Sequence, residues 1–188
     1  MADCARHGGV GRKVAGAISE RHLDPARLAA LAVELQAVHS TLRRALQIAR
    51  EAVEDGDPAA PQRDLLLYCW GFCEALDGHH RSEDAALFPR IIDVRPELAP
   101  VIANLKQDHS MIDHLLGGFR HALESGASRD EQLRHLDGIE AVMETHFGYE
   151  ERQLIEPLAD VDTTGLAGTT LLGPLADHAG DASGSNES

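Results

Sequence analysis

The stretch CEALDGHHRSEDAALFPRI, residues 73–91, mixes two kinds of side chain on one expected helix face. Leu76 and Leu87 belong in a hydrophobic core, whereas His79 and Glu83 ordinarily face water or each other. These four residues follow one another in steps of three and four, which is the spacing of one face of an α-helix. The stretch therefore predicts a core-facing helix that carries histidine and carboxylate on its buried side.

The same periodicity predicts four amphipathic helices along the chain. Asp24 and Pro25 suit the N-cap and the first helical position, and Ser128 with Glu131 forms the S-x-x-E pattern of a capping box. Pro89 lies inside the second helix and predicts a kink or break in its last turn. The expected helices run from Asp24-Pro25 to the EDGDPAAP break at 54–61, from about 62 to 93, from about 97 to 123, and from Ser128 to Pro157. Short connections between them predict an all-α fold, an up-down-up-down four-helix bundle.

The length of 188 residues suggests a single domain with tails. We expect the domain at residues 24–160, where the helical periodicity lies. Residues 1–23 are rich in Gly and mildly basic, which is typical of a flexible N-terminal arm. Residues 161–188 are rich in Gly, Thr, Ser, Asp and Ala, which bury too little apolar surface to fold alone, so we expect a mostly disordered C-terminal tail.

Charge and cysteine content limit the function classes. The formal net charge of −14 repels phosphate groups, so we expect neither nucleic acid nor a membrane as a partner. No segment approaches the ~20 apolar residues of a membrane span, and the N-terminus lacks the apolar run of a signal peptide. Three cysteines are too few for a disulfide framework, and we interpret Cys69 and Cys73, one helical turn apart, as core residues. We therefore expect a cytoplasmic protein.

Three of the expected helices carry a histidine on the apolar stripe and a carboxylate four residues later, on the same helix face. The first helix adds a fourth histidine. At a rise of about 1.5 Å per residue, all four sets lie at a similar depth in an antiparallel bundle. Three carboxylates buried there without a cation would cost on the order of several kcal/mol each. The candidate metal ligands are His79 and Glu83, His109 and Asp113, His146 and Glu150, and His39.

The number of these donors points to two metal ions. Four imidazoles and three carboxylates exceed the four ligands of an ordinary zinc site and suit two octahedral ions of the iron or manganese type. With two bridging carboxylates and an oxo or hydroxo bridge, about one coordination position stays open for a small ligand such as dioxygen, nitric oxide or peroxide. A single His–carboxylate pair is usually a solvated ion pair, and we interpret His80 with Asp84 in that way or as a group outside the ligand set. The alternative to a metal site is an acidic bundle with buried His–carboxylate pairs.

The motifs in these helices resemble those of the hemerythrin-like, HHE cation-binding family. HHRSEDAALFP (79–89), LKQDHSMIDHLL (105–116) and METHFGYEERQLIEPL (143–158) look like its second-, third- and fourth-helix signatures, and AVHSTLRRAL (37–46) looks like the first. The resemblance covers roughly residues 25–160. It implies a four-helix bundle around a non-heme di-iron centre: two iron ions (Fe2+/Fe3+) with an oxo or hydroxo bridge, in preference to manganese.

The resemblance also implies individual roles. By position, the implied ligands, with Glu83 as a bridge, are His39, His79, Glu83, His109, His146 and Glu150. Asp113 stands where oxygen carriers of the family have another histidine, and this anionic donor disfavours simple reversible oxygen carriage. His114 beside Asp113 and Glu151 beside Glu150 stay open as alternative ligands.

Members of this family bind dioxygen reversibly, sense oxygen or iron, handle nitric oxide or peroxide, or oxidise substrates. The resemblance therefore implies a di-iron protein that binds or transforms a small ligand in sensing, scavenging or storage, together with an unidentified redox partner. The alternative is a di-iron oxidase or oxygenase acting on an organic substrate, which needs a pocket beside the irons. An iron store of the ferritin type uses Glu-x-x-His pairs, whereas here the histidine comes first and the step is four.

Overall fold

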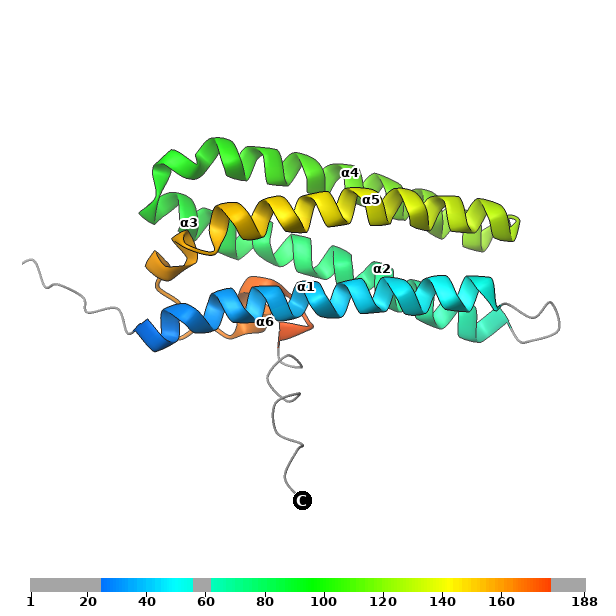
Figure 1. Cartoon of the computed structure of the whole chain (residues 1–188), viewed down its shortest axis with the longest axis horizontal. Coiled ribbons are helices and arrows are strands. Elements are labelled where there is room, and N and C mark those ends of the chain that lie inside the picture. Colours follow the sequence, from blue (N-terminus) through cyan, green and yellow to red (C-terminus); the bar gives the residue numbers. More distant parts are fainter. Residues whose placement is uncertain (1–24, 56–61, 177–188) are drawn as a thin grey trace, which may run out of the picture.

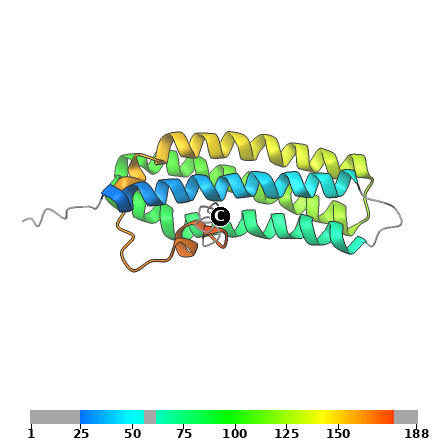
Figure 2. The same cartoon turned by 60° about the horizontal axis from the view of Figure 1, so that its bottom comes forward.

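The computed structural model describes residues 25–55 and 62–176, and these residues form helices and connecting turns without a strand. Four long helices lie side by side along the molecule, as Figures 1 and 2 show. Helix α1 packs against α2 and α5, and α4 packs against α2 and α5, so that the four enclose one core. The bounds are α1 Pro25–Glu54, α2 Gln62–Ser82, α4 Ala99–Glu124 and α5 Arg129–Leu154. The prediction of an all-α fold is confirmed.

The second long helix changes its pitch instead of breaking at Pro89. After α2 the chain passes through a π-helical turn, η1 (Glu83–Leu87), and continues as α3 (Phe88–Val94). The backbone N–H of Phe88 bonds to the carbonyl of Glu83, five residues back. Proline has no N–H to donate and its ring crowds the preceding turn, so a wider turn just before Pro89 accommodates it without ending the helix. The expected kink or break is therefore a local π-turn.

The apolar stripes of the four helices form the core as the sequence pattern predicts. The completely buried side chains include Leu35 and Leu42 from α1, Phe72 and Leu76 from α2, Ile112 and Phe119 from α4, and Ile139, Met143 and Phe147 from α5. Cys69 and Cys73 are buried free thiols within this cluster. Burial raises the thiol pKa to about 12 at Cys69 and to about 11 at Cys73, which keeps both protonated and unreactive.

Turn residues set the ends of the helices near the positions expected from the sequence. Helix α4 follows a short 3-10 turn, η2 (Pro96–Leu98), and the turn after it contains Gly126 at a φ of 66°. Ser128 caps α5, because its hydroxyl accepts a hydrogen bond from the backbone N–H of Glu131 at 3.4 Å. A second 3-10 turn, η3 (Pro157–Asp160), ends the fourth long helix.

Residues 161–176, here called the C-terminal strap, fold back on the bundle. The strap contains a short helix, α6 (Gly168–Leu172), that packs against α1, α2 and η1 (Figure 2). Leu171 and Leu172 insert into the core. This arrangement differs from the expected mostly disordered tail, because two adjacent leucines provide an apolar anchor within an otherwise polar segment. Residues 177–188 of that tail and the expected arm at 1–23 lie outside the described residues.

No helix among the described residues is long and apolar enough to cross a membrane.

Candidate metal centre

Seven buried side chains converge in the middle of the bundle, in two groups that each could hold a metal ion. Within each group the potential ligand atoms all lie within 4.8 Å of one another. All four long helical segments contribute. The first group is His39, His79, Glu83 and Glu150, and the second is His80, His109 and His146.

The two buried glutamates connect these groups. Glu83 directs Oε1 to Nε2 of His79 at 3.3 Å and Oε2 to Nε2 of His109 at 3.5 Å. Glu150 Oε2 lies 3.2 Å from Nε2 of His39 and 4.0 Å from Nε2 of His146. Each carboxylate therefore contacts one histidine from the first group and one from the second, which is the placement that a carboxylate bridge between two metal ions requires.

Four of the histidines are oriented by hydrogen-bond or ionic contacts on the side away from the centre. Nδ1 of His39 lies 2.8 Å from Glu151, and Nδ1 of His109 lies 3.1 Å from Asp84. Nδ1 of His146 faces Asp108 at 3.6 Å, and Nδ1 of His79 faces a backbone carbonyl at 2.9 Å. An oxygen acceptor near Nδ1 favours the tautomer with the proton on Nδ1. Nε2 then carries the lone pair, as in the carboxylate–histidine–metal arrangement of known metal sites.

The second group shows why these lone pairs need a cation. Nε2 of His109 and Nε2 of His146 lie 3.2 Å apart. Nδ1 of His109 faces Asp84, and Nδ1 of His146 faces Asp108 but has no hydrogen-bond partner among the described residues. With both protons on Nδ1, the two Nε2 lone pairs would face each other across this gap. Nε2 of His80 and both carboxylate oxygens of Glu83 and of Glu150 are buried without a hydrogen-bond partner among the described residues. Buried nitrogen and oxygen atoms that lack hydrogen-bond partners and lie close together fit the ligand atoms of a metal centre.

Burial shifts the pKa values of Glu83 and of three histidines in opposite directions. Burial raises the pKa of Glu83 well above its usual range, and the nearby Glu150 carboxylate raises it further. Burial lowers the histidine pKa to about 3 at His79, to about 4 at His146 and well below the ordinary value at His80. These histidines are therefore neutral at pH 7, which is the state in which imidazole binds a metal.

His80 is the site residue that the sequence analysis left out of the ligand set. Its side chain is only 5% exposed, and it stacks on His109 with the ring centroids 4.1 Å apart. The proposed pair with Asp84 does not form, since Asp84 contacts His109 instead. A sequence signal was available, because Cys73, Leu76, His80 and Glu83 also follow one another in steps of three, four and three.

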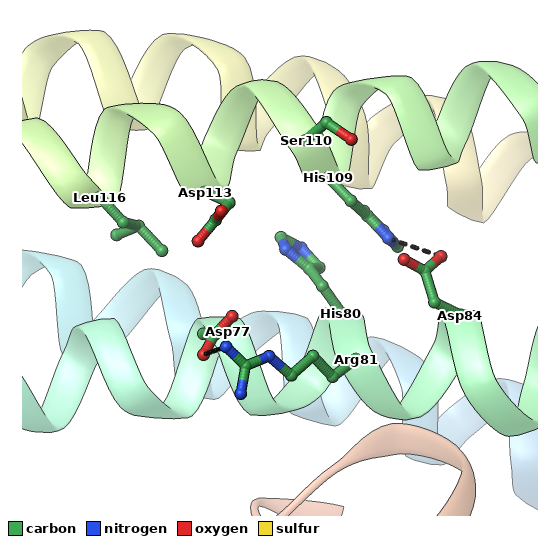
Figure 3. Close-up of a pocket in the computed structure, with 8 residues that line it drawn as sticks. All are labelled: Asp77, His80, Arg81, Asp84, His109, Ser110, Asp113 and Leu116. Carbon is green, nitrogen blue, oxygen red and sulfur yellow. Dashed lines mark hydrogen bonds and ion pairs between the residues drawn. The ribbon is translucent and has the colours of Figure 1, made fainter.

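The remaining candidates lie outside the two groups. Asp113 and His114 are exposed, and the carboxylate of Asp113 faces the space next to His80 (Figure 3). Glu150 is completely buried between the two groups, whereas Glu151 is partly exposed and holds His39 from outside. The structure thus brings together six of the seven residues expected from the sequence, adds His80, and leaves out Asp113.

Comparison with known protein families agrees with this site. Residues 31–159 match the model of the hemerythrin HHE cation-binding domain. The chain belongs to this family. The comparisons with curated proteins and with solved structures gave no match. Hemerythrin HHE domains bind metal cations, and the buried His/Glu cluster is where this hemerythrin domain could bind them.

The C-terminal strap, beyond the residues that match the family model, holds one histidine of the hemerythrin site. The backbone carbonyl of Leu172 accepts a hydrogen bond from Nδ1 of His79 at 2.9 Å. The next residue, Gly173, has a φ of 85° and packs directly on the backbone of His79. A Cβ at Gly173 would stand 2.7 Å from Cα of His79, closer than side-chain carbons approach. Only glycine allows the strap to reach this position.

We predict that Gly173→Ala lowers metal affinity by roughly 10–100-fold. The added Cβ displaces the strap from His79, so the hydrogen bond that orients His79 is lost. Gly165→Ala is the matched control: Gly165 also has a positive φ, 77°, but a Cβ there meets no atom within 4 Å. Both variants carry the backbone cost of about 1 kcal/mol for a left-handed alanine. Competition with a chelator measures the affinity, and equal affinities for the two variants would show that the strap does not position the ligand.

Proposed function

We propose that this hemerythrin domain holds two iron ions and binds or transforms a small ligand, such as dioxygen, nitric oxide or peroxide, in sensing, scavenging or storage. His39 and His79 would hold one ion, and His80, His109 and His146 would hold the other. Glu83 and Glu150 would join the ions. The set of five imidazoles and two carboxylates suits iron, and manganese accepts similar ligands less readily when imidazole dominates.

The observation that carries this proposal is the pair of facing Nε2 atoms of His109 and His146, 3.2 Å apart. Nδ1 of His109 lies 3.1 Å from Asp84 and Nδ1 of His146 lies 3.6 Å from Asp108, so either ring would lose its carboxylate contact if it turned Nε2 away from the centre. Iron, when bound, supplies Lewis acidity and a change of oxidation state. The chain supplies five imidazoles, the two glutamates and a core that excludes water from the first group.

The size of the adjacent cavity supports a small ligand over an organic substrate. A cavity of about 200 Å³ lies beside His80 and His109. Pockets for drug-sized organic molecules are roughly 300–1,000 Å³.

The free thiols of Cys69 and Cys73 are consistent with a reducing compartment, which supports the proposal that the protein works in the cytoplasm.

Metal content tests the proposal and the ligand set together. Protein grown with iron and purified without chelator is expected to contain about two irons per chain. His80→Ala should lower the iron content, because the second ion loses one of its three imidazole ligands. Asp113→Ala should keep both ions, since its carboxylate lies outside the cluster. Elemental analysis against protein concentration gives the number.

His114→Ala is the control for His80→Ala, because it removes an exposed histidine near the same site. Circular dichroism of each metal-free variant checks that the helices are retained. Wild-type protein without iron, even after anaerobic reconstitution, would refute the proposed function. Loss of iron in Asp113→Ala but not in His80→Ala would restore the ligand set expected from the sequence.

A further inference from the structure

The cavity between α2 and α4 runs from the surface of the bundle to the second histidine group (Figure 3). Arg81, Ser110 and Asp113 line its outer part and are exposed. His80 and His109 line its inner end, and each is only 5% exposed. Nε2 of His80 has no hydrogen-bond partner among the described residues. A buried nitrogen that can bind a cation therefore lies at the end of a passage from solvent.

The other histidine group is closed to solvent. His39 and His79 are completely buried. Phe147 stacks on His39 with the ring centroids 3.9 Å apart, and the strap covers His79 through Leu172. A cation that comes from solvent through the cavity therefore reaches the second group before the first.

The charges around the cavity leave one carboxylate without a partner. Asp77 pairs with Arg81 at 2.9 Å, and an oxygen of Asp84 lies 3.9 Å from Nζ of Lys106. Asp113 makes no hydrogen bond or ion pair with any residue that the structure describes. The uncompensated negative charge of Asp113 thus stands at the outer part of the cavity, where it attracts cations from solvent.

The two buried glutamates connect the inner end of the cavity to the closed group. Glu83 directs one oxygen to His109 at 3.5 Å and the other to His79 at 3.3 Å. Both oxygens of Glu83 and both of Glu150 lack a hydrogen-bond partner among the described residues. Oxygen ligands are therefore available along the way from the second group to the first.

We propose that this cavity is the route by which ferrous ions enter and leave the centre, and that Asp113 is the first residue to bind them. This inference rests on the proposed function. Asp113 attracts and binds the hydrated ion, and the imidazoles of His80 and His109 then replace part of its water. The two buried glutamates pass the first ion on to the closed group, and the second group keeps the next one.

Asp113→Asn and Arg81→Gln should change the rate of iron uptake in opposite directions. The first removes the attracting charge, and the second removes a repelling one and leaves Asp77 unpaired. We expect uptake to slow roughly three- to tenfold in Asp113→Asn and to accelerate roughly two- to fivefold in Arg81→Gln. Both effects should shrink in about 1 M salt, where the Debye length is about 3 Å.

The rates are measured on metal-free protein mixed with Fe2+ in the absence of oxygen. A coloured ferrous chelator, added after a series of delays, reports the iron that has not yet been taken up. Rates that change in the same direction in the two variants, or in neither, would overturn the role of Asp113.

Ser110→Trp tests the route itself, since Ser110 lines the cavity from α4 and its side chain is exposed. The indole should slow iron uptake and iron release to excess chelator at least tenfold each. The affinity should stay unchanged, which separates a blocked passage from a distorted centre. Gln107→Trp is the matched control, because Gln107 is also exposed on α4 and does not line the cavity. Equal rates for the two tryptophan variants would show that iron enters elsewhere.

Final iron content distinguishes failure of this inference from failure of the proposed function. Every variant should reach the iron content of wild type, since none replaces a side chain of the two buried groups. Iron-free wild type would remove the proposed function itself. Variants that load to the wild-type level at the wild-type rate would leave the metal centre intact and refute only the cavity as its entrance.

Discussion

Replacing Glu83 by glutamine is expected to make the metal-free protein more stable and the metal-loaded protein less stable. In the metal-free state Glu83 is completely buried, and both oxygens lack a hydrogen-bond partner among the described residues. The pKa of Glu83 is raised, first by burial and then by the charge of Glu150, because both make the ionised carboxylate unfavourable. A neutral amide of similar shape needs neither a buried charge nor the uptake of a proton on folding, and it can donate to Nε2 of His79. We expect a gain of about 2 kcal/mol, or roughly 4–8 °C in Tm for a domain of this size.

With metal the sign should reverse, because the proposed centre uses Glu83 to join its two ions. Metal at 100 times its dissociation constant stabilises the folded state by about 2.7 kcal/mol, and the variant should lose most of this gain. The measurement is the melting temperature of wild type and variant, each with iron and with chelator. Glu74→Gln, on the exposed face of α2, is the control and should follow wild type in both conditions. A variant that is less stable than wild type in chelator would contradict the buried-charge argument.

The fold was predictable because each long helix has a one-sided apolar stripe. Leu76 and Leu87 on one helix, or Ile112 and Phe119 on another, are buried when the apolar stripes of the four helices pack around one core. The position of the strap was less predictable. Leu171 and Leu172 are buried together with Val161 and Ala176 in a segment without helical periodicity, and their burial depends on a surface of α1, α2 and η1 that exists only once the bundle has formed.

The site was predictable to the level of a helix face but not to that of a single residue. His80 was misassigned because the step of four from His80 to Asp84 indicates a surface ion pair, whereas the inward face of α2 is wide enough for two adjacent histidines. Asp113 was expected to be a ligand because it follows His109 by four residues. In the structure Asp113 lines the cavity, and His80 on the neighbouring helix joins His109 and His146 in the second group.

Acid is expected to unfold the metal-free domain well above the pH at which carboxylates alone would do so. The pKa of His79 is lowered to about 3 and that of His146 to about 4, and that of His80 is also well below its ordinary value. Below pH 6.5 the unfolded chain protonates these three histidines and the folded chain does not, so unfolding takes up protons and stability falls as the pH falls. Each histidine contributes about 1.4 kcal/mol per pH unit.

Two groups act in the opposite direction. The raised pKa of Glu83 lets the folded state hold a proton that the unfolded state lacks above pH 4.5, which offsets one of the three histidines. The raised pKa of His39 adds stability that is fully present below pH 6.5 and is lost as the pH rises, so it adds no slope in the acid range. Two histidines remain uncompensated, and stability should fall by about 2–3 kcal/mol per pH unit between about pH 6 and 4.5.

Urea denaturation in chelator at a series of pH values measures this slope. His80→Asn removes one of the three titrating groups and should reduce the slope by about 1.4 kcal/mol per pH unit. His114→Asn, at an exposed position, should leave the slope unchanged. A urea midpoint that stays constant from pH 7.5 to 5 would mean that these histidines are already protonated in the fold or reach water. In that case they could not be the neutral, buried donors on which the metal centre depends.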